Sequence, residues 1–340
     1  MKVISPCFAI ALSLAAGSSL SAQAQPTADF YRNKQIRLVV GYASGNDYDI
    51  GARVLAKYLP RYIPGQPSII VQNIPQAASL VAANYVYAQA PRDGTVIGSF
   101  SRNLVTLTLL GRANIEIDPR RLIWLGATSF PGHVCVVSDA ALVKTPADLF
   151  THELIVGSNG SGSSNSIIPT VLNRVLGTKF HIIEGYRGAP DAVLAAERGE
   201  VQGVCASLGQ FRSFGRLFDS GKLRILIRAE EAALPEAPDV PSIFDYAKTD
   251  DQRAAMRFVF STTEFGRPYV FPPGVSPERV ELMRKAIAAA AQDPELVADA
   301  KKANLDMAYR PPQDLERLVG KLYETPPEML ETVKKLVPNL

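Results

Sequence analysis

The chain has 340 residues, of which 47% are hydrophobic and 20% are charged, and its formal net charge is +3. This length is enough for two hydrophobic cores. Charges of both signs are interspersed, and the sequence has no basic stripe with interleaved aromatic side chains, so the composition argues against a nucleic-acid partner.

The first 24 residues have the pattern of a secretory signal peptide. Lys2 supplies the positive start, an apolar stretch follows, and Ala22-Gln23-Ala24 is a small-x-small cleavage site. The apolar stretch is too short for a transmembrane helix, and Cys7 lies in it without a lipobox. We therefore expect cleavage after Ala24 and export of a soluble mature chain to the periplasm.

The mature chain begins with alternating strands and helices. Apolar runs rich in β-branched residues predict the strands, and hydrophobic residues at three- and four-residue spacing predict the helices. The strands are expected at 36–41, 68–73 and 95–100, and the helices from Asp49 to Pro60 and over 77–90. Asp49 is the expected N-cap of the first helix. This order predicts a doubly wound, mostly parallel sheet, whose ligands bind beyond the carboxyl ends of the strands.

The same alternation restarts at residue 133 and predicts a second α/β unit. Its strands are expected at 133–138, 153–158, 180–186, 201–207 and 223–229, and its helices at 145–150, 166–177, 190–199 and 211–221. A proline-rich connector then leads to a short strand at 268–274 and to helices at 249–260, 276–292, 294–304, 312–323 and 326–337. We expect these tail helices to pack on the first sheet.

The fold class is therefore α/β with two lobes, each a doubly wound, mostly parallel sheet with flanking helices. Lobe 1 is expected to comprise residues 25–129 and 230–340, and lobe 2 residues 130–229. Two lobes joined by two crossings of the chain form a hinge with a cleft between them.

Cys135 and Cys205 are the cysteines of the predicted mature chain. In an oxidising compartment they form either a disulfide or two separately buried thiols, and their number leaves both states open. Cys135 lies on the first strand of lobe 2 and Cys205 on an inner strand, so the two strands can be neighbours. We predict a disulfide that closes a loop of about 70 residues.

Small polar loops follow several predicted strands, and we expect them to bind a ligand. Glycine allows the backbone to approach a ligand closely, and helix N-termini direct free N–H groups into the same space. Each loop alone is also explained as an ordinary turn that caps a helix, but several at matching strand ends favour a carboxylate site. The loops are YASGNDYD (42–49), SFSRN (99–103), GSNGSGSSNS (157–166), YRGAPD (186–191) and ASLGQ (206–210).

Several enzymatic motifs are absent from the sequence. GSNGSG lacks the lysine of a P-loop and does not match G-x-G-x-x-G, and no G-x-S-x-G elbow occurs. The three histidines, His133, His152 and His181, have no metal-type spacing, so we expect strand-end or surface residues rather than ligands or bases. We predict no catalytic residue, no cofactor and no metal.

The order of several segments resembles the extracytoplasmic receptors of tripartite tricarboxylate transporters, the TctC-like family. IRLVVGYASGNDYDIGARVLAKYL, IVQNIPQA and PRDGTVIG are similar to the opening of those receptors, and ELIVGSNGSGS, APDVPSI and PPGVSPERVELMRKA follow in the family's order. The resemblance covers essentially the whole mature chain.

The resemblance implies a type II-like periplasmic binding protein that closes on a small organic acid and delivers it to a two-component integral membrane permease. Loop N–H groups, hydroxyls and ordered waters of both lobes would hold the carboxylate. The ligand-binding residues carried over by position are Tyr42, Ala43, Ser44, Gly45, Asn46, Asp47, Tyr48, Asp49 and Ser101 in lobe 1, and Gly160, Ser161, Gly162, Ser163, Ser164, Tyr186, Gly188 and Ser207 in lobe 2. We expect a monomer.

The chain departs from the family at Ser44-Gly45-Asn46-Asp47, where members often have Pro-Gly-Gly-Gly, and at Pro75-Gln76-Ala77-Ala78, where they often have Pro-Gly-Ala-Gly. Asp47 adds a negative charge to a site expected to hold an anion. Its side chain can turn to solvent, pair with Arg102, which we add to the site residues, or contact a hydroxyl or cationic group of the ligand. We expect the first. A sensor for a membrane histidine kinase and an exported enzyme are the rival functions.

Overall fold

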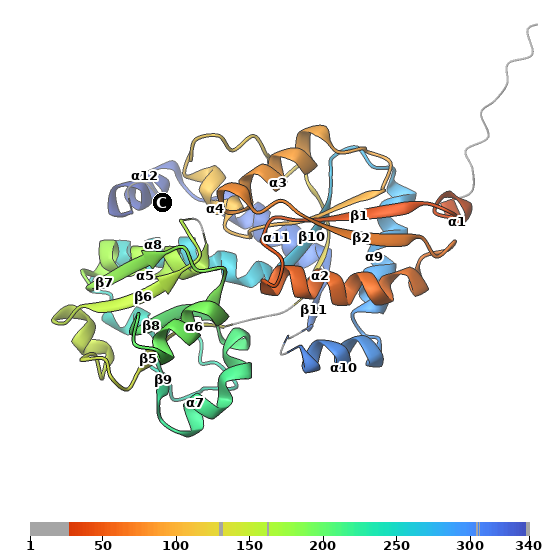
Figure 1. Cartoon of the computed structure of the whole chain (residues 1–340). Coiled ribbons are helices and arrows are strands. Elements are labelled where there is room, and N and C mark those ends of the chain that lie inside the picture. Colours follow the sequence, from red (N-terminus) through yellow and green to blue (C-terminus); the bar gives the residue numbers. More distant parts are fainter. Residues whose placement is uncertain (1–26, 129–131, 162, 304, 306, 338–340) are drawn as a thin grey trace, which may run out of the picture.

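The fold is described from a computed structural model, over residues 27–128, 132–161, 163–303, 305 and 307–337 (Figure 1). The predicted signal peptide lies outside these residues. Two separate sheets form the molecule, and helices flank each of them. This confirms the predicted two-lobed α/β fold class, while the exact bounds of the lobes stay a prediction.

The first sheet has six strands in the order β11-β4-β10-β3-β1-β2. β1 runs parallel to β2 and β3, whereas β10 lies antiparallel between β3 and β4. The sheet is mixed rather than mostly parallel, because the chain returns to it along β10 after forming the second sheet. The strands are β1 (Gln35–Val40), β2 (Ser68–Asn73), β3 (Val96–Ser99), β4 (Ile123–Thr128), β10 (Arg267–Phe271) and β11 (Tyr309–Arg310).

The second sheet has five strands in the order β7-β6-β8-β5-β9. β6 runs parallel to β7 and β8, and β5 runs antiparallel to β8 and β9, so this sheet is mixed as well. All five strands fall within or close to the ranges predicted from hydrophobic runs. They are β5 (His133–Ser138), β6 (Leu154–Ser158), β7 (Phe180–Glu184), β8 (Gly203–Ser207) and β9 (Leu223–Arg228).

The predicted helices also lie close to their expected ranges, whereas α1 and α4 were not predicted. Thr145 caps the short turn that starts with Pro146. The α-helices are α1 (Thr27–Phe30), α2 (Asp47–Tyr58), α3 (Leu80–Asn84), α4 (Leu104–Leu109), α5 (Ser164–Leu176), α6 (Ala189–Glu197), α7 (Gly215–Asp219), α8 (Asp250–Phe260), α9 (Pro277–Ala290), α10 (Pro294–Lys302), α11 (Pro312–Tyr323) and α12 (Pro327–Leu336). The shorter helical turns are η1 (Leu59–Tyr62), η2 (Gln76–Ser79), η3 (Tyr85–Gln89), η4 (Pro146–Phe150), η5 (Leu208–Phe214), η6 (Ile243–Tyr246) and η7 (Ser261–Phe265).

The first sheet is covered by helices on both faces, which explains the nearly continuous apolar run of β1. Ile36, Leu38 and Val40 are fully buried in one cluster, together with side chains of α2 and α9. Val39, on the opposite face, belongs to a second cluster with side chains of α3, α4 and α11. Alternate residues of the strand therefore serve two different cores.

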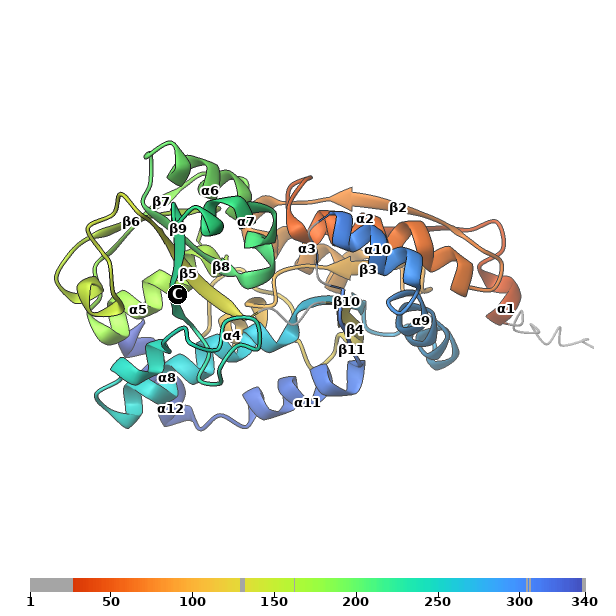
Figure 2. The ribbon, with the colours of Figure 1, turned by 90° about the horizontal axis from the view of Figure 1, so that it is seen from below.

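In contrast to the expectation from the sequence, the tail helices do not all pack on the first sheet. α9 and α11 contact β4, and α10 contacts α2, but α8 packs against α5 of the second lobe and α12 packs against α8 (Figures 1 and 2). The Gln252 side chain also donates a hydrogen bond to the Val175 carbonyl, at 2.7 Å. An amphipathic pattern shows which helix face is apolar and not which lobe covers it, so this part of the prediction is wrong.

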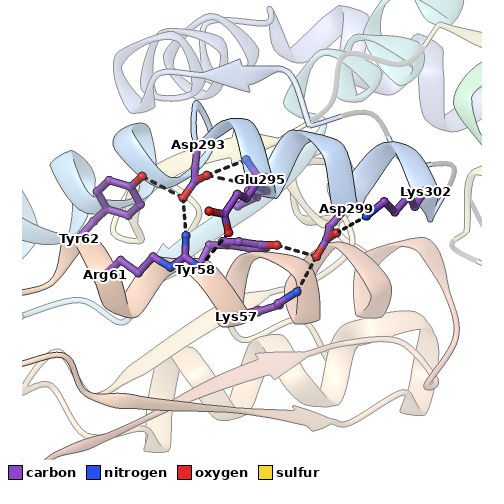
Figure 3. Close-up of polar contacts among 9 residues, drawn as sticks. Lys57, Tyr58, Arg61, Tyr62, Asp293, Glu295, Asp299 and Lys302 are labelled. Atoms are coloured by element: carbon purple, nitrogen blue, oxygen red, sulfur yellow. Dashed lines mark hydrogen bonds and ion pairs between the residues drawn. The ribbon is translucent and has the colours of Figure 1, made fainter.

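A polar network fixes α10 on α2 and on the turn that follows it (Figure 3). The Asp299 carboxylate accepts hydrogen bonds from Lys57 and Tyr58, both at 2.6 Å, and Asp293 accepts one from the Tyr62 hydroxyl at 3.0 Å. The contact with Lys57, followed by that with Tyr58, holds the pKa of Asp299 far below its usual value. These contacts hold the C-terminal end of α2, while its N-terminus faces the second lobe.

Asp49 ties the loop after β1 to α2 and β2. Its buried carboxylate accepts hydrogen bonds from the Gly45 N–H at 2.8 Å, from Arg53 at 3.0 Å and from the Asn73 amide at 2.8 Å. Burial alone would raise the pKa of Asp49, but the hydrogen bonds from Arg53, Gly45 and Asn73 outweigh it and hold the pKa below 3.8. The shape of the loop therefore depends on this carboxylate.

Asp49 is not the N-cap of the first helix, so that prediction is wrong. Helix α2 begins at Asp47, and the side chain of Asn46 accepts a hydrogen bond from the Tyr48 N–H at 3.0 Å. Asn46 has extended backbone angles, as an N-cap requires. Asp49 lies one turn too late for this role and bonds back to the loop instead.

Cys135 and Cys205 are direct partners on the antiparallel strands β5 and β8, and a disulfide joins them. Both residues are buried in the second lobe. The bridge connects positions 70 residues apart in the sequence. It therefore holds together the first and the fourth strand of this sheet in chain order.

The mature protein, unfolded in denaturant without reductant, should show no free thiol on titration. Replacing both residues, as Cys135→Ala and Cys205→Ala, should lower the free energy of unfolding by up to about 4 kcal/mol in the chain-entropy model. Two titratable thiols in the unreduced protein would contradict the bridge.

Asp49→Asn should lower the free energy of unfolding by about 1.5–3 kcal/mol at neutral pH, because it weakens several hydrogen bonds to a buried charge. Since the folded pKa of Asp49 is lowered, its contribution is complete above the ordinary pKa of 3.8 and is lost as the pH falls through the folded value. Denaturant unfolding between pH 2 and 7 should therefore show a smaller acid loss of stability in the variant. The exposed Asp29→Asn, whose partner is Arg32, is the control and should change little.

Candidate ligand-binding site

The loops that follow β1 and β6 lie together between the two sheets and line a narrow pocket of about 20 Å³, room for about one water molecule, which is partly open to solvent. The first loop leads into α2 and the second into α5, so the N-termini of both helices lie at this pocket. Its position at the carboxyl ends of strands is the usual place of a ligand site in an α/β fold. The lining residues are Tyr42, Asn46, Asp47, Tyr48, Arg102, His133, Asn159, Ser163, Ser164, Asn165 and Gln210.

Part of the predicted site lies in the wall of this pocket. The predicted residues that line it are Tyr42, Asn46, Asp47, Tyr48, Arg102, Ser163 and Ser164. The other described residues of the predicted site do not form its wall, namely Ala43, Ser44, Gly45, Asp49, Ser101, Gly160, Ser161, Tyr186, Gly188 and Ser207. Gly162 lies outside the described residues.

Several residues of the second group support the wall from behind. The Ser44 hydroxyl donates to the Asp49 carboxylate at 3.3 Å, and the Gly160 carbonyl accepts from the Ser163 hydroxyl at 2.7 Å. Ser101 is buried, and its hydroxyl accepts a hydrogen bond from the Asn103 N–H. These contacts shape the two loops, so the residues act through the loops in this structure.

The two lobes touch at the edge of the pocket. A Cβ atom built on Gly188, the N-cap of α6, would lie 3.4 Å from the Asn46 amide nitrogen. Asn46 belongs to the first lobe and Gly188 to the second. The absence of a side chain at position 188 therefore lets the loops approach each other.

Arg102 is the most deeply placed cation of the pocket wall. The residue is 6% exposed, and it donates hydrogen bonds to the Gly266 carbonyl at 3.2 Å and to the His133 Nε2 at 2.9 Å. Tyr48 donates to the same carbonyl at 3.4 Å. Arg102 thus joins the loop after β3 to the start of β10 and to the start of β5.

His133 is a strand-end residue, as predicted, but it is fully buried and lines the pocket. A guanidinium can only donate, so Nε2 accepts from Arg102 and the ring proton lies on Nδ1. Burial and then Arg102 lower the pKa of His133, while Glu230 opposes them. Glu230 also accepts a hydrogen bond from the His133 backbone N–H at 2.6 Å. The ring is therefore neutral at physiological pH.

In contrast to the expectation from the sequence, the Asp47 side chain does not turn to solvent. It does not pair with Arg102 either. Its carboxylate lies 3.5 Å from the guanidinium of Arg267, and its side chain is 14% exposed while that of Arg267 is 5% exposed. Arg267 begins β10, which enters the first lobe late in the chain. The charge that Asp47 adds to the pocket is thus balanced by a residue that local sequence analysis did not consider.

Two amides of the second loop present unsatisfied polar atoms in the pocket wall. The side-chain oxygen of Asn159 and the side-chain nitrogen of Asn165 are buried, and neither has a hydrogen-bond partner among the residues that the structure describes. An orphaned buried polar atom costs free energy unless a ligand or water satisfies it. The two amides are therefore polar groups next to the pocket that a ligand or a water molecule could satisfy.

Tyr42 and Tyr48 pack against each other, with ring centroids 4.5 Å apart. Burial raises the pKa of both hydroxyls, so both stay protonated at physiological pH. They close the first-lobe side of the pocket with aromatic surface and add donors at its edge.

Four lining residues do not belong to the site predicted from the sequence, namely His133, Asn159, Asn165 and Gln210. Arg267, which contacts Asp47 from behind the wall, was not predicted either. Asn159, Asn165 and Gln210 lie in polar loops that were singled out, so their residue type was the available signal. Nothing local pointed to Arg267, because its role depends on the path of the chain back to the first sheet.

No helix among the described residues is long and apolar enough to cross a membrane. The described residues also contain no group of three or more His, Cys, Asp or Glu side chains that could hold a metal ion.

Comparison with known proteins agrees with this architecture. A curated protein of Cupriavidus necator, the UPF0065 protein in gbd 5'region, is 26% identical over 96% of this chain and 92% of its own length. A Rhodopseudomonas palustris protein solved with adipate has a TM-score of 0.66 at 19% identity, over 88% of this chain and 97% of its own. MatC of the same species, solved with malate, has a TM-score of 0.65 at 17% identity, over 88% and 99%.

These structural similarities show the two-lobed binding-protein fold. The family model described as "Tripartite tricarboxylate transporter family receptor" matches residues 52–332, which is most of the chain. Proteins of this family are periplasmic solute-binding receptors. This chain therefore belongs to the tripartite tricarboxylate transporter receptor family.

Proposed function

We propose that this receptor binds a small organic acid in the pocket between its two lobes and delivers it to a two-component integral membrane permease. The observation that carries the proposal is the buried guanidinium of Arg102 in the pocket wall. In the described part of the chain, both hydrogen-bond partners of this guanidinium, the Gly266 carbonyl and the His133 ring, are neutral.

A buried charge with neutral partners is costly, and a ligand carboxylate would compensate it. Guanidinium and carboxylate groups also match in hydrogen-bond geometry. The N-terminal turns of α2 and α5 add N–H donors and partial positive charge on either side. The free amide nitrogen of Asn165 supplies a further donor. The pocket is therefore suited to an anion with oxygen acceptors.

Contacts from both lobes mean that a ligand would favour the closed arrangement of the lobes. Two structurally similar proteins were solved with malate and with adipate, which supports a small carboxylic acid as the ligand class. Family membership supports a permease as the partner, and the signal-like N-terminus supports cleavage after Ala24 and action in the periplasm. The predicted site residues that lie behind the wall would act by shaping the loops.

Arg102→Met should abolish most acid binding, with an affinity loss of about a hundredfold or more, because it removes the buried cation. The acid is first identified by native mass spectrometry of the protein as purified, together with calorimetry on a panel of mono-, di- and tricarboxylates. The control is Arg198→Gln, which removes an exposed arginine paired with Glu200. Unchanged affinity in a folded Arg102→Met protein would show that the acid is held elsewhere.

Gly188→Leu should weaken binding by at least about tenfold while leaving the melting temperature of the free protein nearly unchanged. The extended backbone of Gly188 (φ 172°) accepts any residue, but the new side chain would stand between the lobes, against Asn46. Small-angle scattering should show a smaller ligand-induced compaction than in the native protein. Gly320→Leu, on an exposed face of α11 with open space around it, is the matched control. Full compaction and native affinity in Gly188→Leu would refute the proposed closure.

A further inference from the structure

We propose that Arg267 is a specificity-determining residue of this pocket: by neutralising Asp47 it makes the site select acids without a positive charge and discriminate against acids that carry an ammonium group. This inference rests on the proposed binding of an organic acid at Arg102. It concerns a residue that lies behind the pocket wall and acts through Asp47.

Asp47 is an acidic residue in the wall of a pocket suited to anions, and its position has a defined structural cause. It is the first residue of α2, where the helix N-terminus favours a carboxylate. Its carboxylate oxygen lies 3.5 Å from the Arg267 guanidinium, and both side chains are largely buried. The two opposite charges therefore form a pair that faces the pocket with its acidic end.

Helix α2 leaves space for the Arg267 side chain at Gly51. A Cβ atom at Gly51 would lie only 3.3 Å from the Nε atom of Arg267. A glycine inside a helix is unfavourable by about 1 kcal/mol relative to alanine, and here it leaves room for the arginine. The helix that carries Asp47 thus also accommodates the cation that neutralises it.

The Asp47–Arg267 pair determines the local charge next to the part of the ligand that lies beyond its carboxylate. With Arg267 in place, Asp47 is a compensated acceptor that suits a hydroxyl group, and a ligand ammonium group would be repelled by two guanidiniums, Arg102 and Arg267. Without Arg267, the Asp47 carboxylate would attract an ammonium group while Arg102 attracts the carboxylate. Opposite charges at the two ends of the pocket would then favour an amino acid.

The test uses matched acids that differ in one group on the second carbon. Succinate, malate and aspartate carry hydrogen, hydroxyl and ammonium there, and the corresponding three- and five-carbon series extend the panel. Calorimetry at low salt gives the ratio of the affinity for the amino acid to that for the hydroxy acid. In the native protein this ratio should be below one. In Arg267→Met it should rise by about tenfold to a hundredfold, as expected for one uncompensated charge close to the ligand.

Further variants separate this role from a structural one, which would change the affinity for all acids alike. Arg267→Lys keeps the charge and should keep the native ratio. Asp47→Asn removes the negative charge beside Arg267 and should lower the ratio further, so the proposal stays testable if Arg267→Met does not fold. Arg284→Met, which removes an arginine on α9 bonded to the Trp124 carbonyl, controls for the loss of a partly buried arginine and should leave the ratio unchanged.

The outcomes distinguish this inference from the proposed function. If the native protein binds none of the acids in the three series, both the proposed function and the inference fall. If it binds them but the ratio is the same in the native protein, in Arg267→Met and in Asp47→Asn, the proposed function stands and Arg267 is a structural residue only. A native ratio above one would also overturn the inference.

Discussion

The buried guanidinium of Arg102 is the interaction around which the pocket is organised. A charge that is removed from water needs hydrogen bonds and a compensating charge. Arg102 obtains the hydrogen bonds from the Gly266 carbonyl and the His133 ring, where the chain enters β10 and β5. Because both partners are neutral, we propose that a ligand carboxylate supplies the remaining compensation. The same side chain thus links the entry to each sheet with the acid that would bind there.

Much of the fold could be predicted from the sequence, because buried strands such as β1 have apolar residues on both faces and stand out as continuous runs. β4 was missed, since its run contains Gly126 at a positive φ, next to an irregularity in its pairing with β10. β11 has two residues and no pattern to detect. The placement of α8 and α12 on the second lobe could not be predicted, because amphipathic spacing does not identify the covering surface.

The candidate site was predictable only as far as it is local. The small polar residues of the loops mark them as candidate ligand-binding segments, and the loops do supply Asn46, Ser163 and Ser164 to the pocket. Arg267 lies 220 residues from its partner Asp47 in the sequence, so no spacing rule connects the two. Asp49 shows a related limit, because aspartate has the same propensity to cap a helix and to bond back to a loop, and only the backbone geometry decides between them.

Asp47 shows why the charge of a site has to be counted in three dimensions. From the sequence alone, an aspartate in the anion-binding loop is in conflict with the expected ligand. In the folded chain Arg267 balances Asp47, Glu230 contacts the His133 backbone, and Arg102 bonds to the His133 ring, which is consistent with the proposed role of Arg102 toward a carboxylate. The acidic residue then no longer opposes binding and instead becomes an acceptor whose charge depends on a distant arginine. Ligand specificity in such a receptor can therefore change through a residue that never touches the ligand.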